Sequence, residues 1–66
     1  MDIENAIHIA MRRKQWTYHR LAKETAELFE EGVSASFLYA WARGTNKMGQ
    51  ENLDKVFTAL GIPKDW

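Results

Sequence analysis

Apolar residues recur every three to four positions in four stretches of the chain, at about residues 3–14, 18–31, 34–43 and 50–60. This spacing places them along one face of an α-helix, and no stretch has the alternation of a half-buried strand. The pattern therefore predicts an all-α fold of four to five helices, with a final turn in the C-terminal tail as the fifth. The residues expected to face the core are Ile3, Ala6, Ile7, Ala10, Met11, Leu21, Ala22, Thr25, Leu28, Phe29, Val33, Phe37, Leu38, Trp41, Leu53, Val56, Phe57 and Leu60.

Capping residues indicate where these helices begin and end. A short polar side chain before a helix accepts a hydrogen bond from a free backbone N–H of the first turn, and glycine readily adopts the left-handed conformation that follows the last turn. The expected N-caps are Asp2, Thr17 and Ser34. The expected C-terminal glycines are Gly32, Gly44 and Gly61.

The composition fits one small domain, residues 1–66, near the lower size at which a chain folds alone. The chain has no cysteine, which excludes disulfides, thiolate metal sites and a cysteine nucleophile. Hydrophobic residues make up 45% of the sequence, enough for helix packing to supply the stability. No apolar run approaches the roughly 20 residues of a membrane span, and the acidic start is unlike a signal peptide. We expect a soluble, cytoplasmic protein with no membrane partner.

Charge is distributed unevenly along the chain, although nine basic and nine acidic residues cancel to a net charge of zero. Residues 11–23 include five bases and no acid, whereas residues 24–31 include four acids and no base. Two further bases, Arg43 and Lys47, follow. A fold that joins the basic groups would have one positive and one negative face. The alternative is a solvated surface of mixed charge.

The segment from Val33 to Gly44 has a property that bears on function. One edge of this expected helix is apolar, while the other combines small and polar residues without any acid. The second edge consists of Ser34, Ala35, Ser36, Tyr39, Ala40 and Arg43. A helix face without negative charge and with small side chains can lie against a polyanion. DNA reading is therefore the first functional hypothesis.

Several short motifs occur in an order that is typical of one family. They are Leu21-Ala22 near the start of one helix, then Gly32-Val33-Ser34, Leu38, Trp41, Arg43-Gly44, Leu53 and Ala59-Leu60-Gly61-Ile62. Over about residues 3–62 the chain resembles the helix-turn-helix family of lambdoid phage repressors, Cro proteins and their bacterial relatives, the xenobiotic-response-element type. The resemblance implies a lambda-repressor-like fold and a repressor- or Cro-like regulator of transcription, from a phage or a bacterium, that binds double-stranded DNA.

The resemblance also implies roles for individual residues, because the second helix of the motif lies in the major groove with its early side chains at base edges. On matching positions, the base-facing residues are Ser34, Ala35, Ser36, Tyr39 and Ala40. The residues expected at backbone phosphates are Thr17, Tyr18, Arg20, Lys23, Arg43 and Lys47. For each of these bases the alternative is an ordinary surface charge, and for the alanines it is simple helix propensity.

The connection between the two helices of the motif departs from the family. About six residues, 26–31, are additional between the Leu-Ala pair and Gly32. Either the second helix is longer and buries Leu28 and Phe29, or the loop is longer. The resemblance further implies a homodimer on a two-fold DNA site. Ile62, Trp66 and the last helix are the candidate pairing surfaces.

An enzyme is not expected. His8 and His19 lie on different expected helices, and no cluster of His, Asp or Glu has metal-ligand spacing. The glutamates at positions 24–31 are three and four residues apart, as on a solvated helix flank. We expect no catalytic residue, no cofactor, no metal and no small-molecule substrate. The alternatives are a protein-interaction module of the same fold, antitoxin- or anti-repressor-like with weak DNA affinity, and an architectural factor that bends DNA.

Overall fold

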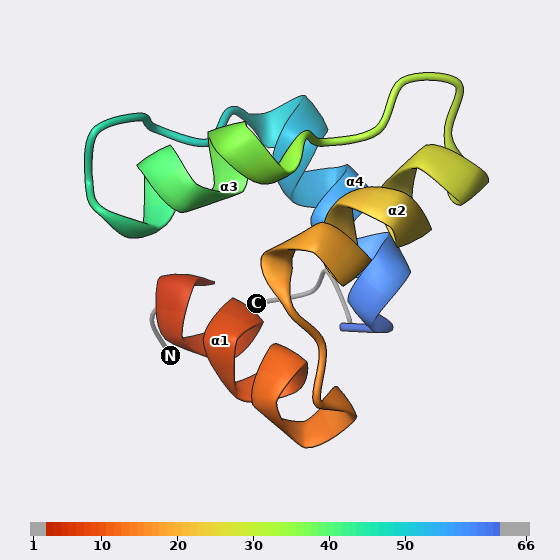
Figure 1. Cartoon of the computed structure of the whole chain (residues 1–66), viewed down its shortest axis with the longest axis horizontal. Coiled ribbons are helices and arrows are strands. Elements are labelled where there is room, and N and C mark those ends of the chain that lie inside the picture. Colours follow the sequence, from red (N-terminus) through yellow and green to blue (C-terminus); the bar gives the residue numbers. More distant parts are fainter. Residues whose placement is uncertain (1–2, 63–66) are drawn as a thin grey trace.

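A computed structural model describes residues 3–62 and contains, over that range, four α-helices and no strand (Figure 1). The helices are α1 (Ile3–Lys14), α2 (Tyr18–Leu28), α3 (Ala35–Ala42) and α4 (Gln50–Leu60). The prediction of an all-α chain is confirmed for these residues. The expected N-cap at Asp2, the final turn of the tail and Trp66 as a pairing surface lie outside the described residues.

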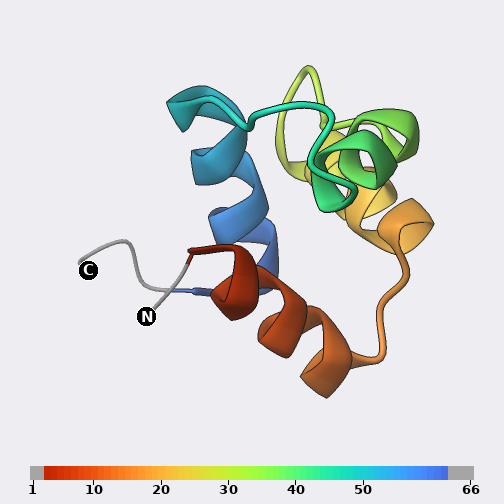
Figure 2. The same ribbon diagram turned by 90° about the vertical axis from the view of Figure 1, so that its left-hand side faces the viewer.

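The four helices share one hydrophobic core. α2 packs against α3 and α4, and α1 packs against α4 (Figure 2). The largest fully buried apolar side chains come one from each helix and are Ile7, Leu21, Leu38 and Val56. Burial of one such side chain stabilises a fold by about 1.5–3 kcal/mol. The buried side chains of all four helices thus belong to a single hydrophobic cluster.

Most of the predicted core is confirmed. The buried apolar residues are Ala6, Ile7, Met11, Leu21, Val33, Leu38, Trp41, Val56, Phe57 and Leu60. The half-buried members of the predicted set are Ala10, Ala22, Phe29, Phe37 and Leu53. The prediction is wrong for Ile3 and Leu28, which are 40% and 55% exposed. Ile3 is the first residue of α1 and Leu28 the last of α2, so their own helix covers each of them on one side only.

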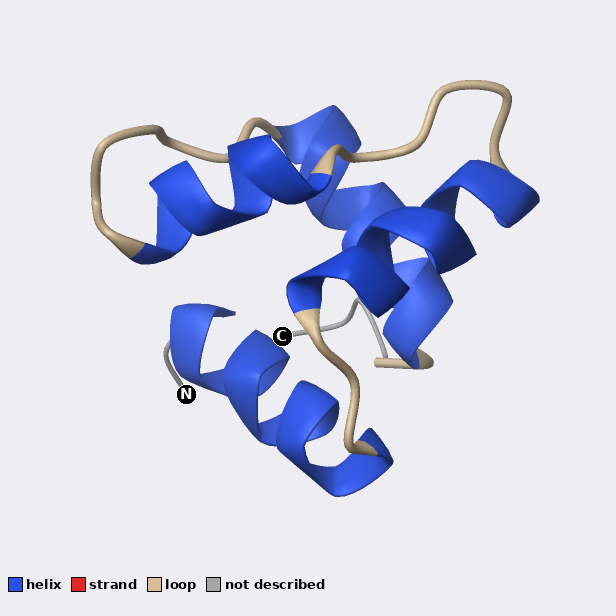
Figure 3. Ribbon diagram, viewed as in Figure 1, coloured by secondary structure: helices blue, strands red, loops and turns tan. Residues whose placement is uncertain are grey.

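The connection between α2 and α3 combines the two alternatives considered for residues 26–31. α2 continues through residue 28, and its C-cap Phe29 has an extended backbone (φ −129°, ψ 152°). Residues 29–34 then form a loop that leads to α3 (Figure 3). The second helix is thus longer than the family pattern implies, but it ends three residues before Glu31 and leaves Leu28 at the surface.

Gly32 does not cap α2, contrary to the prediction. Among the described glycines only Gly44 and Gly61 have positive φ values, +81° and +72°. A close approach of two backbone segments explains the glycine at position 32 instead. A Cβ built on Gly32 would lie 2.6 Å from the backbone nitrogen of Ala26, so no side chain fits there unless the backbone shifts. The loop therefore lies directly against α2.

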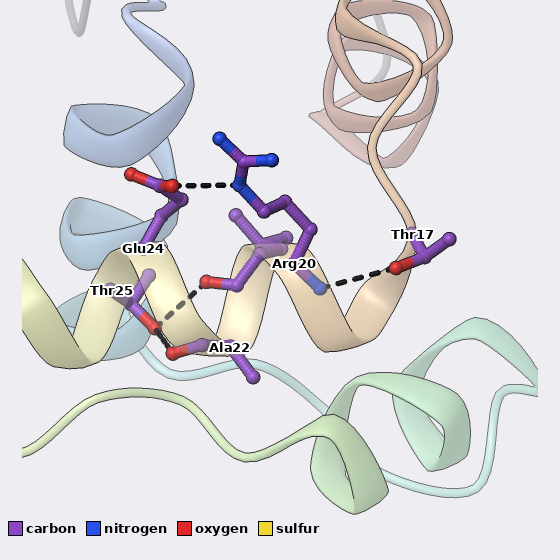
Figure 4. A network of polar contacts seen from close by, with 6 residues as sticks. Thr17, Arg20, Ala22, Glu24 and Thr25 are labelled. Atoms are coloured by element: carbon purple, nitrogen blue, oxygen red, sulfur yellow. Dashed lines mark hydrogen bonds and ion pairs between the residues drawn. The ribbon is translucent and has the colours of Figure 1, made fainter.

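The N-caps of α2 and α3 are confirmed. Thr17 Oγ1 accepts a hydrogen bond from the Arg20 N–H at 3.2 Å (Figure 4), and Ser34 Oγ accepts one from the Phe37 N–H at 3.1 Å. Each cap satisfies a backbone donor that has no partner within its own helix. The caps fix where both helices begin, which matters because both beginnings belong to the candidate interface.

Thr25 connects α2 to the segment that precedes α3. It is fully buried, and its hydroxyl donates to the carbonyl oxygens of Leu21 at 3.1 Å and Ala22 at 2.9 Å (Figure 4). The same oxygen accepts a hydrogen bond from the buried backbone N–H of Val33 at 3.0 Å. One hydroxyl thereby satisfies an amide that would otherwise be buried without a partner. This bond holds the chain at the entry to α3.

We expect Thr25→Val to destabilise the fold by about 1–3 kcal/mol, because the nearly isosteric side chain leaves the Val33 N–H buried and unpaired. The free energy of unfolding from urea denaturation measures the loss. Thr25→Ser is the matched control, because it keeps the hydroxyl and removes one methyl group. A Val variant as stable as the Ser variant would show that the hydroxyl contributes nothing.

Candidate nucleic-acid interface

The predicted base-facing side of α3 is at the surface. Ser34 and Ser36 are exposed, Tyr39 is 43% exposed, and Ala35 and Ala40 are half-buried. The opposite side of the helix is formed by Leu38 and Trp41, which are buried in the core. Because the apolar side anchors α3, the small and hydroxyl-bearing side remains partly or fully accessible along the whole helix.

Aromatic contacts join the middle of α3 to the beginning of α2. The ring of Tyr39 lies 4.8 Å from that of Tyr18 and 5.9 Å from that of His19, both in edge-to-face geometry. Such pairs add about 0.5–1.5 kcal/mol beyond the area they bury. A residue predicted to face bases is thus in direct contact with one predicted to face phosphates.

The beginning of α2 has the features of an anion-binding helix end. Thr17 is exposed and caps the helix, and the first turn contains no acidic residue. The free backbone N–H groups and the positive end of the helix dipole attract a negatively charged group at such an end. The first turn of α3 also lacks an acid. Both helix beginnings are therefore compatible with a polyanion.

Arg20 is engaged within the protein. Its Nε donates to Glu24 Oε2 at 2.7 Å (Figure 4), and its guanidinium lies 5.4 Å from the centroid of the Trp16 ring. The Arg20 side chain is 54% exposed, so the ion pair with Glu24 is largely screened by solvent. A phosphate would have to compete with Glu24 for this guanidinium, and this weakens Arg20 as a phosphate ligand.

The remaining predicted phosphate residues are exposed cations. Lys23 lies on α2, while Arg43 caps the C-terminal end of α3 and Lys47 lies in the loop before α4. The half-buried Met48 packs against the core beside Lys47 and anchors this loop. Tyr18 therefore contacts Tyr39 in the middle of α3, whereas Arg43 and Lys47 lie at and beyond the C-terminal end of this helix.

An open cleft beside this surface contains residues that the sequence did not identify. Its volume is about 450 Å³, and its lining comprises His8, Met11, Arg12, Trp16, Thr17, Tyr18 and Tyr39. Arg12 follows His8 by four residues on α1, so one face of that helix forms a wall of the cleft. The i,i+4 spacing of the two residues was the available signal, but nothing local indicates that this face meets the beginning of α2.

His8 connects α1 with both α2 and α3. Its Nε2 lies 2.9 Å from the Tyr18 hydroxyl, within hydrogen-bond distance. Its ring is stacked on Trp41, with the centroids 5.3 Å apart and the planes 25° from parallel. The half-buried imidazole thus joins α1 to α2 through a polar contact and to α3 through a ring contact.

The surroundings of Tyr18 favour its neutral form. Burial raises the pKa of the Tyr18 hydroxyl above the ordinary value of 10.0, and the nearby Tyr39 and Glu4 raise the pKa further. These causes oppose a negative charge at the cleft. At neutral pH the hydroxyl therefore keeps its proton and can donate one hydrogen bond while it accepts another.

The acidic stretch lies at the other end of α2 from Thr17. Glu27, Glu30 and Glu31 are exposed on the last turn of the helix and the following loop, and Glu24 is half-buried in its pair with Arg20. The predicted separation of charge along the chain is therefore preserved along α2, with its beginning free of acids and its end acidic.

Over residues 3–62 no group of three or more His, Cys, Asp or Glu side chains is arranged to hold a metal ion. None of the described helices is long and apolar enough to cross a membrane. Comparison of the chain with protein-family models, with curated proteins and with solved structures finds no match.

The variant Tyr39→Phe leaves Tyr18 as the sole tyrosine. We expect the Tyr18 hydroxyl of the folded variant to titrate with a midpoint above 10. Burial, the largest cause, persists in this variant. Because the folded chain holds this proton more tightly than the unfolded chain, the stability present below pH about 10 falls as the pH rises through the folded pKa. Phenolate absorbance measures the midpoint, with the variant unfolded in urea as the reference. Equal midpoints in both states would contradict the burial of Tyr18.

Proposed function

We propose that this protein is a sequence-specific, double-stranded-DNA-binding regulator of transcription, repressor- or Cro-like, that inserts α3 into the major groove. The observation on which this depends is the outer side of α3, which is free of acids, lined with small and hydroxyl-bearing residues, and flanked by the capped beginning of α2. The proposal includes a lambda-repressor-like fold, a cytoplasmic location and the absence of catalytic activity.

The helix arrangement supports this proposal. α2 and α3 pack against each other, and the apolar side of α3 faces the core. In a helix-turn-helix protein the first helix of the motif crosses the DNA backbone while the second lies in the groove. Here α2 corresponds to the first helix of the motif and α3 to the second. Thr17 and Tyr18, at the beginning of α2, then face one DNA strand. The six-residue loop at 29–34 is longer than a tight turn between two such helices.

Base recognition by this helix is modest in chemical terms. Ala35 and Ala40 suit contact with thymine methyl groups, while the hydroxyls of Ser36 and Tyr39 suit single hydrogen bonds to base edges. The front turn of α3 has no Arg, Asn or Gln for a bidentate contact. Specificity then depends partly on the shape and deformability of the DNA site.

Phosphate contacts supply most of the affinity. The helix end at Thr17 and the hydroxyl of Tyr18 bind one strand, and Arg43 and Lys47 bind the other. Lys23 adds longer-range attraction, and Arg20 contributes less because of its ion pair with Glu24. Two copies bind a two-fold site. Ile62 contributes less to this pairing than its sequence position suggests, because it is half-buried and packs against its own core.

One observation favours a second function, a protein-interaction module with weak DNA affinity. Leu28 is 55% exposed and lies among the exposed glutamates at the end of α2. An apolar side chain surrounded by acids suits a partner with a basic rim and an apolar centre. Binding to mixed genomic DNA at low salt separates this function from the first.

Selection of bound sequences from a random duplex pool tests the proposal. We expect an enriched site with two half-sites about 10 base pairs apart, centre to centre, because two copies would contact one face of the duplex. We also expect thymines opposite the alanines of α3. A pool without enrichment, together with no binding to genomic DNA at low salt, would reject DNA reading and favour the interaction module.

Replacing Lys47 with alanine should weaken binding to all duplexes alike and reduce the slope of log affinity against log salt by about one unit, because one phosphate contact is lost. Fluorescence anisotropy with two unrelated duplexes over a salt series measures both effects. Lys55→Ala, which removes a lysine of α4 that ion-pairs with Glu51, is the control and should leave the slope unchanged. A loss confined to one sequence would assign Lys47 to base reading instead.

A further inference from the structure

The His8–Tyr18 pair is a polar side-chain contact between α1 and α2. The two atoms, His8 Nε2 and the Tyr18 hydroxyl oxygen, are 2.9 Å apart. Both residues line the open cleft, together with Arg12 and Thr17. The contact is therefore adjacent to the beginning of α2, where the proposed function has a DNA phosphate.

The direction of this hydrogen bond depends on the protonation of His8. Tyr18 has one hydroxyl proton, and its raised pKa keeps that proton in place. When the imidazole is charged, both of its nitrogens are donors, so the Tyr18 oxygen must accept and its O–H is available to another partner. When the imidazole is neutral, Nε2 can instead accept a hydrogen bond from the Tyr18 O–H. The O–H then points to His8 and is no longer available as a donor in the cleft.

We infer that His8 is a positioning residue of the DNA interface: protonated His8 fixes the Tyr18 hydroxyl as a donor toward a backbone phosphate, so DNA binds more tightly at lower pH. This inference rests on the proposed function and adds a pH response to it. The sign follows from the chemistry. The charged imidazole permits only the outward O–H, and the additional binding is lost as His8 releases its proton.

The charged and titratable groups near His8 come from α1, α2 and α3. On its own helix Arg12 lines the same cleft, and Glu4 influences the charge at Tyr18. α2 contributes Tyr18, and α3 contributes the Tyr39 hydroxyl and the Trp41 ring; no residue of α4 lines the described cleft.

The test is fluorescence anisotropy with a labelled duplex of the enriched sequence, at constant ionic strength, between about pH 5.5 and 8, where imidazoles change charge. We expect the wild-type affinity to rise roughly three- to tenfold toward the acidic end, as one added hydrogen bond predicts. His8→Gln should abolish this rise, because its amide does not titrate. Tyr18→Phe should remove most of it, because His8 keeps its charge but the donor is gone.

His19→Gln is the matched control, because His19 is the second histidine of the chain, is exposed and contacts Tyr39. This variant should retain the wild-type rise. Thermal unfolding at each pH shows which variants are folded. If His8→Gln is unfolded, an NMR titration of the His8 ring in wild type and in Tyr18→Phe reports the contact between His8 and the Tyr18 hydroxyl instead.

The outcomes separate this inference from the proposed function. If duplex binds but Tyr18→Phe keeps the full wild-type rise, or His19→Gln abolishes it, the role of His8 is overturned and DNA binding stands. An unchanged His8 titration in Tyr18→Phe also overturns the role of His8. If wild type binds no duplex at any pH, both are overturned.

Discussion

The hydrogen bond from the Val33 N–H to the hydroxyl of Thr25 is the constraint on which the position of α3 depends. α3 has eight residues, too few to be stable as an isolated helix in water. Burial of Leu38 and Trp41 attaches one side of this helix to the core, but burial alone is not directional. The bond at Thr25 adds direction, because it fixes the backbone just before Ser34 begins the helix. The side of α3 that meets solvent follows from these contacts.

The features predicted correctly from the sequence are those determined by neighbours along the chain. Thr17 and Ser34 cap helices because their oxygens reach a donor three residues ahead, whatever the rest of the fold does. Burial at Leu38 and Val56 follows from helical periodicity in the same way. Gly32 is different. A glycine is required there because the backbone of Ala26 lies too close for a side chain, and that approach exists only once the loop has folded back onto α2. The end of α2 at Leu28 could not be predicted for the same reason.

In the candidate site, too, the features set by neighbours along the chain were predictable and those set by packing between helices were not. The accessible side of α3 was predictable because an amphipathic helix with buried Leu38 and Trp41 must present its opposite side to solvent. The pairing of Arg20 with Glu24 was also visible in the sequence, as an i,i+4 spacing on one helix. The cleft and the contact of His8 with Tyr18 were not, because they require the packing of α1 beside the beginning of α2. Sequence patterns indicate the faces of helices, but only the fold determines which faces meet.

A net charge of zero alters how such an interface must work. Salt-dependent affinity for DNA grows with the number of phosphates neutralised, and here Arg20 is already paired while the end of α2 is acidic. With few cations available, each remaining contact represents a larger fraction of the total binding free energy. Under the role we propose for His8, one hydroxyl that either donates to a phosphate or turns inward to His8 alters the dissociation constant severalfold. A more basic protein would show the same severalfold change in the dissociation constant, but its site would stay occupied in both states, because the other phosphate contacts keep binding tight.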